Sequence, residues 1–102
     1  MTVTLINPFV IPTEREEEML CIWKESSARL AKMPGFIETR LHRNTGEEDK
    51  TFLFINIALW ESVEAYHAAF KDAPPDPPEL ALAGVKYYSG LFQPILTLKK
   101  ES

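Results

Sequence analysis

The sequence predicts an α+β domain whose elements follow one another in the order β-α-β-β-α-β. Two stretches with helical spacing of apolar residues, 14–32 and 63–70, alternate with strand-like stretches. The two middle strand-like stretches, 36–43 and 50–60, are joined by a polar turn that is typical of a hairpin. The length of 102 residues favours one domain, spanning 1–102.

The first strand is expected from Val3 to Val10, where β-branched and apolar residues dominate. Pro8 has no backbone N–H to give to a neighbouring strand. The proline therefore predicts that this strand lies at an edge of the sheet or ends early.

The first helix is expected from about Glu14 to Lys32, and Pro34-Gly35 ends it. Thr13 and Glu16 have the spacing of a capping box at its start. The helical spacing places one apolar set on a single face: Met19, Trp23, Leu30 and Met33.

The second strand is expected from Phe36 to Arg43 and the third from Lys50 to Trp60. Ser62 is the expected cap of a second helix, Val63 to Phe70. A final strand is expected from Val85 to Leu98. Before it, Ala73 to Pro78 predicts a stiff connection and Glu79 to Ala83 a short helical turn.

The third strand is apolar or β-branched on both faces except for Asn56. A buried amide without hydrogen-bond partners costs about 1–3 kcal/mol. Alternation places one set on a single strand face: Phe52, Phe54, Asn56, Ala58 and Trp60. An amide and an indole among aromatic rings predict the wall of a ligand pocket.

This element order is that of the ferredoxin-like fold, a four-stranded antiparallel sheet with both helices on one face. The opposite face is expected to carry Leu53, Ile55, Ile57, Leu59, Ile37 and Leu41. So apolar a face is rarely exposed to water. We therefore predict a homodimer in which two copies pack sheet to sheet.

Composition narrows the possible partners and compartment. The formal net charge is −4 and no basic stripe is present, which disfavours nucleic acid. Cys21 is the only cysteine, so no internal disulfide can form, and we expect it to be a buried small hydrophobic side chain. No signal-peptide pattern or membrane-length apolar run is present, so a cytoplasmic protein is expected.

Four segments carry a resemblance to a known family: Leu5-Ile-Asn-Pro-Phe9, Pro34-Gly-Phe36, Thr39-Arg-Leu-His-Arg43, and the stretch from Asn56 to Tyr66. With them the chain resembles the antibiotic biosynthesis monooxygenase domain family from Leu5 to about Phe92. The resemblance implies a dimeric α+β barrel built from ferredoxin-like subunits. It implies the fold more specifically than a reaction, because the fold hosts several functions.

Cofactor-free, quinone-forming monooxygenases of polyketide biosynthesis form one group in this family. Their asparagine, tryptophan and tyrosine match Asn56, Trp60 and Tyr66, which the resemblance makes the candidate catalytic residues. Some of these enzymes have an arginine after the second helix, and the chain has none between Lys71 and Val85.

Haem-degrading members form a second group. Their first-strand asparagine and third-strand tryptophan match Asn7 and Trp60, but residues 71–86 contain no histidine to match their haem ligand. Asn7, Trp23 and Phe54 are the candidate substrate-binding residues, since they belong to the expected first strand, helix face and third-strand face.

Four functions remain open at this point. The first is a monooxygenase that uses O₂ on an aromatic or quinol-type molecule, with no cofactor and no metal. The others are a binding protein without turnover, a haem binder, and a structural dimerisation unit whose cavity is filled by side chains. No role can be assigned to His42, His67, Tyr87 or Tyr88.

Overall fold

The computed structural model describes residues 2–72 and 85–101. Its elements are β1 (Val3–Val10), the 3₁₀ turn η1 (Thr13–Arg15), α1 (Glu16–Leu30), β2 (Phe36–Arg43), β3 (Phe54–Trp60), α2 (Val63–Asp72), β4 (Lys86–Tyr87) and β5 (Gly90–Phe92). This order confirms the predicted ferredoxin-like α+β fold. The expected connection at 73–78 and helical turn at 79–83 lie outside the described residues.

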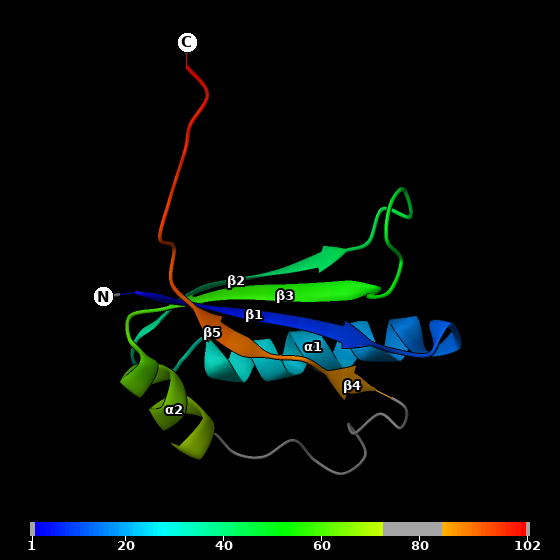
Figure 1. Cartoon of the computed structure of the whole chain (residues 1–102). Coiled ribbons are helices and arrows are strands. Elements are labelled where there is room, and N and C mark those ends of the chain that lie inside the picture. Colours follow the sequence, from blue (N-terminus) through cyan, green and yellow to red (C-terminus); the bar gives the residue numbers. More distant parts are fainter. Residues whose placement is uncertain (1, 73–84, 102) are drawn as a thin grey trace.

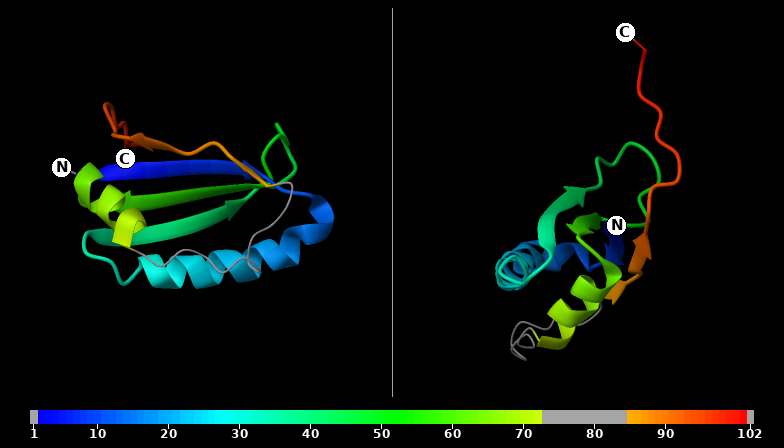
Figure 2. Two further views of the ribbon diagram at one scale, coloured as in Figure 1. Left: turned by 90° about the horizontal axis from the view of Figure 1, so that it is seen from below. Right: turned by 90° about the vertical axis from the view of Figure 1, so that its left-hand side faces the viewer.

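One antiparallel sheet has both helices on a single face (Figures 1 and 2). Its strand order is β2-β3-β1-β4, and β5 also pairs with β1. β4 and β5 together therefore occupy the place of the expected fourth strand. Neither of the two described helices is long and apolar enough to cross a membrane.

β1 is a central strand, so the edge position predicted from Pro8 is wrong. Tyr88 N donates to the carbonyl of Pro8 at 2.9 Å. In an antiparallel strand, the N and O of one residue point to the same neighbouring strand. The nitrogen of Pro8 therefore points toward β4 and β5, and its missing N–H removes no hydrogen bond between β1 and β3. The interruption between β4 and β5 lies opposite Asn7 and Pro8, between the pairs Phe9–Tyr87 and Ile6–Gly90.

The helix starts differ in how they are capped. The predicted capping box is wrong, because no side chain caps α1 and Thr13 instead begins a 3₁₀ turn closed by Arg15 N on the Pro12 carbonyl at 2.9 Å. The predicted cap of α2 is confirmed, since Ala65 N donates to Ser62 Oγ at 3.0 Å.

The register of β2 shifts by one residue at a β-bulge between Phe36 and Glu38. Beyond the bulge, residues that a strict alternation would place on the open face turn to the helix side. Leu41 accordingly packs in the helix-side core, as does Leu53, which corrects their predicted place on the open face. Ile37 lies in the bulge and is 44% exposed.

Among the described residues, the buried core forms two clusters on the helix side. One contains Val3, Leu5, Ala58, Trp60 and Ala69, and the other contains Phe9, Ile11, Met19 and Phe54. The cross-strand pair Asn7–Asn56 lies between them along β1 and β3. Two asparagines therefore interrupt the core where it would otherwise be continuous. Cys21 is exposed, so its predicted burial is wrong.

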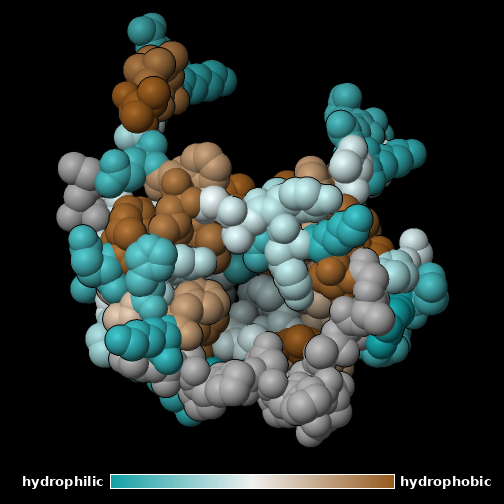
Figure 3. All heavy atoms as spheres, turned by 60° about the horizontal axis from the view of Figure 1, so that its bottom comes forward, coloured by the Kyte–Doolittle hydropathy of each residue, from teal (hydrophilic) through white to brown (hydrophobic). Residues whose placement is uncertain are grey.

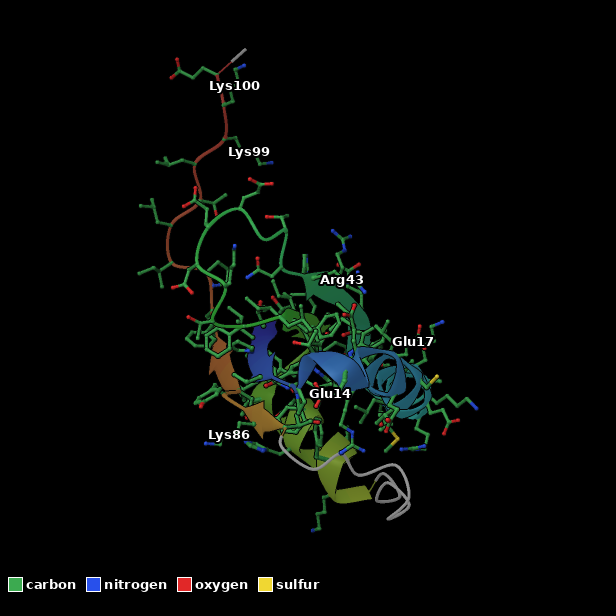
Figure 4. The ribbon with its side chains drawn as sticks, turned by 90° about the vertical axis from the view of Figure 1, so that its right-hand side faces the viewer. Glu14, Glu17, Arg43, Lys86, Lys99 and Lys100 are labelled. Carbon is green, nitrogen blue, oxygen red and sulfur yellow. The ribbon has the colours of Figure 1, made fainter. Side chains whose placement is uncertain are left out.

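The predicted final strand ends at Phe92 instead of Leu98. Residues 93–101, here called the C-terminal arm, leave the end of β5 and project on the side of the sheet without helices (Figures 1 and 2). The arm carries strongly exposed aliphatic side chains: Ile95, Leu96 and Leu98. Lys99 and Lys100 lie near its end (Figure 4).

We expect Gly35→Ala to destabilise the protein by about 3 kcal/mol, measured as the free energy of unfolding in urea. Gly35 has φ +86°, and an added Cβ would lie 2.4 Å from Cβ of Ala65 in α2. Its carbonyl also accepts a hydrogen bond from Glu61 N at 2.8 Å, so the turn has little room to move.

Gly46→Ala is the matched control, because Gly46 has φ +84° but no atom within 4 Å of an added Cβ. It should lower the free energy of unfolding by only about 1 kcal/mol, the cost of placing alanine at a positive φ. Equal losses in the two variants would contradict the close packing of Gly35 on α2.

Candidate functional site

A cavity of about 200 Å³ lies between the sheet and α1, at the interruption of the core. Figure 3 turns the helical side of the molecule forward and shows a recess near its centre, with apolar surface along one side. The cavity is lined by Leu5, Asn7, Phe9, Met19, Ile22, Trp23, Ser26, Ser27, Leu30, Phe36, Thr39, Asn56, Ala58, Trp60, Phe70 and Tyr87. This hollow argues against a purely structural unit with a filled interior.

Three buried polar atoms on the cavity wall have no hydrogen-bond partner among the described residues: Asn7 Oδ1, Trp23 Nε1 and Trp60 Nε1. Each such group costs about 1–3 kcal/mol when it remains unpaired. One is an acceptor and two are donors. A ligand or water that pairs with them would recover part of that cost.

Asn56 presents a fourth polar group to the same cavity. Thr39 Oγ1 donates to Asn56 Oδ1 at 2.6 Å. The amide oxygen is thus engaged, and the amide nitrogen has no hydrogen bond to another described residue. Asn56 is the direct cross-strand partner of Asn7, so both amides lie side by side on the helix-facing surface.

Trp60 is held by aromatic packing at the end of β3. Phe36 and Tyr66 both approach it edge to face, with ring centroids 5.2 and 5.8 Å away. The indole is 1% exposed, so its position is fixed from several sides. Such support lets an N–H keep one direction relative to a bound molecule.

Four of the six predicted site residues line the cavity: Asn7, Trp23, Asn56 and Trp60. Tyr66 does not, because its ring packs against Trp60 and Phe70 outside the cavity wall. Phe54 is also absent from the wall, since it is 2% exposed in the core beside Phe9.

Sequence reasoning missed several polar residues of the wall: Ser26, Ser27, Thr39 and Tyr87. The two serines carry a signal, because they lie three and four positions after Trp23 and share its helix face. Thr39 carries none, since strict alternation assigns it to the other face of β2.

Tyr87 is the only titratable side chain among the described residues of the wall. Burial raises the pKa of its phenol above the ordinary value, and burial does the same to the pKa of Tyr66. Both phenols therefore remain protonated at neutral pH. His42 and His67 do not line the cavity.

The antibiotic biosynthesis monooxygenase family model matches residues 2–74. The chain belongs to this family. The matched range contains all four predicted residues that line the cavity: Asn7 on β1, Trp23 on α1, and Asn56 and Trp60 on β3. The comparison with curated proteins gives no significant match.

Solved structures of family members superpose over nearly the whole chain. A proposed monooxygenase from Shewanella loihica PV-4 is 29% identical, with a TM-score of 0.78, covering 94% of this chain and 96% of that one. SnoaB, a cofactor-independent oxygenase from Streptomyces nogalater, is 26% identical, with a TM-score of 0.75 and coverage of 97% and 98%.

A third similar structure is the haem-degrading protein Rv3592 from Mycobacterium tuberculosis. It is 23% identical, with a TM-score of 0.68, covering 97% of this chain and 100% of that one. At this identity the likeness shows a shared fold.

We expect the phenols of Tyr66 and Tyr87 to ionise only above pH 10, the ordinary value for tyrosine. Absorbance at 295 nm, followed against pH in wild type and in Tyr66→Phe and Tyr87→Phe, measures this. Each variant should lose a transition above pH 10. A lost transition below pH 10 would contradict the burial of that phenol.

Proposed function

We propose that the protein is a cofactor-independent monooxygenase that oxidises an aromatic or quinol-type small molecule with O₂. The observation that carries this proposal is an apolar cavity whose described wall offers hydrogen-bond donors but no side chain that is charged at neutral pH. Family membership and the likeness to a cofactor-independent oxygenase support it.

In this proposal the substrate supplies the electrons. An anthrone loses a methylene proton to water and forms an enolate, and O₂ accepts its electrons as a new C–O bond forms. Protonation gives a hydroperoxide at that carbon. Loss of the second methylene proton with cleavage of the O–O bond gives the ketone and hydroxide, which takes up a proton. One O₂ thus yields one quinone and one water.

The cavity favours the anionic forms along this route. Trp60 Nε1 and the amide nitrogen of Asn56 can donate to a substrate oxyanion, and such preorganised donors are usually a large catalytic term. Asn7 Oδ1 can accept from a substrate hydroxyl. Trp23 Nε1 is another donor, and the Trp23 side chain on α1 lines the cavity opposite the sheet.

The enzyme should consume O₂ with 1,8-dihydroxyanthrone faster than the spontaneous rate. Asn56→Ala and Trp60→Phe should each lower kcat/KM by roughly 10- to 100-fold, because each removes one donor. An oxygen electrode measures the rates. Tyr88→Phe is the control, since Tyr88 is exposed and lies outside the cavity wall.

Two other functions have distinct outcomes in the same assays. A binding protein without turnover would bind 1,8-dihydroxyanthraquinone, with quenched tryptophan fluorescence, and show no O₂ uptake above background. A haem binder would shift the Soret band of hemin. We expect no shift, because residues 71–86 contain no histidine and neither histidine of the chain lines the cavity.

We further propose that the enzyme is a homodimer through the sheet face without helices. Cross-strand pairs there are apolar at their centre: Ile6 with Ile57, and Pro8 with Ile55. The C-terminal arm projects on the same side and exposes three aliphatic side chains. A second copy would cover both surfaces.

Sedimentation equilibrium should give a dimer at micromolar concentration. Ile57→Glu should shift the protein to the monomer, because it places a carboxylate at the centre of the apolar face. Ala28→Glu adds the same charge to an exposed site on α1 and should leave the dimer intact. A wild-type monomer, or equal effects of both variants, would contradict this interface.

A further inference from the structure

We propose that Thr39 is a positioning residue that sets the direction of the Asn56 amide, and that the bulge in β2 is what brings Thr39 to the cavity. The inference rests on the proposed function, because it concerns the donors that would stabilise a substrate anion. It assigns a role to a side chain that contacts Asn56 without having to contact the substrate.

The bulge decides which side chain of β2 faces the cavity. Glu38 pairs with Leu59 and Thr39 with Ala58, and Ala58 belongs to the buried helix-facing row. If Ile37 instead paired with Leu59, as in a strand without a bulge, Glu38 would pair with Ala58 and lie on that row. A carboxylate there would oppose a bound anion, whereas the threonine hydroxyl is neutral.

The hydroxyl of Thr39 fixes the amide of Asn56 across the strand pair. It donates to Oδ1 at 2.6 Å, so Oδ1 is held toward β2. The two N–H groups of the amide then face away from Thr39 and remain available to a ligand. The opposite amide orientation would present an acceptor to the oxyanion, which would repel it.

Asn7 lies on the other side of Asn56 from Thr39, since β3 runs between β2 and β1. It lies directly opposite Asn56, at a cross-strand distance of about 5 Å between Cβ atoms. Its Oδ1 is buried and has no hydrogen bond to any residue that the structure describes. If Thr39 released Oδ1, the Asn56 amide could turn over, and its oxygen, in place of its N–H groups, would then lie on the side of Asn7.

The test combines Thr39→Val, which keeps the shape and removes the hydroxyl, with Thr39→Ser, which keeps the hydroxyl. Using 1,8-dihydroxyanthrone, Thr39→Val should lower kcat/KM about tenfold and Thr39→Ser by less than about threefold. Thr39→Val should add nothing in the Asn56→Ala background, since the amide it positions is gone. Additive losses would overturn the proposal.

The ligand-free protein gives an independent readout. In ¹⁵N-labelled protein, the side-chain amide signals of Asn56 are assigned by their loss in Asn56→Ala. They should move in Thr39→Val and stay near their wild-type positions in Thr39→Ser. Thr4→Val makes the same change on the opposite sheet face, since Thr4 pairs with Leu59, and should not move them.

The two readouts separate this inference from the proposed function. Absent O₂ uptake in wild type would reject the oxygenase activity, while the amide signals would still report whether Thr39 holds Asn56. Asn56 signals that stay in place in Thr39→Val would overturn the positioning role even if the enzyme is active.

Discussion

The antiparallel register of β1 on β3 is the constraint on which the rest of the structure depends. It pairs Val3 with Trp60, Leu5 with Ala58, Asn7 with Asn56 and Phe9 with Phe54, so every buried residue of one strand meets a buried residue of the other. A slip of one residue would turn the buried row of one strand to the open face. The same register brings two amides together at the only polar step of this row. Fold and candidate site therefore follow from one alignment of two strands.

Element order and the main wall of the site could be predicted from the sequence, because both depend on local patterns. The apolar run before Trp60 and the cap at Ser62 identify β3 and α2 without knowledge of their neighbours. The central position of β1 could not be predicted, because the cost of Pro8 depends on which neighbour its nitrogen faces. The place of Tyr66 and Phe54 behind the wall depends on packing between α2 and the sheet, which alternation along one strand does not describe.

The bulge in β2 shows how much a single residue can change. The sequence Phe36–Arg43 contains no glycine that would indicate a bulge, so a regular alternation of faces is expected along the whole strand. It moves Leu41 into the core and turns Glu38, Arg40 and His42 to the open face. It also joins Thr39 to the site. Strict alternation would point the charged side chains of β2 toward the helices. Because of the bulge, β2 instead presents the neutral hydroxyl of Thr39 to the cavity.

The division of the core into two clusters has a consequence for the energetics of binding. A planar molecule in the cavity would touch Leu5 and Trp60 on one side and Phe9 and Met19 on the other. It would act as the missing segment of the hydrophobic core, joining two groups that the asparagine pair keeps apart. The same apolar contacts would then stabilise both the complex and the fold, so the free energy of unfolding would be highest when the cavity is occupied. Release of the bound molecule would separate the two clusters again.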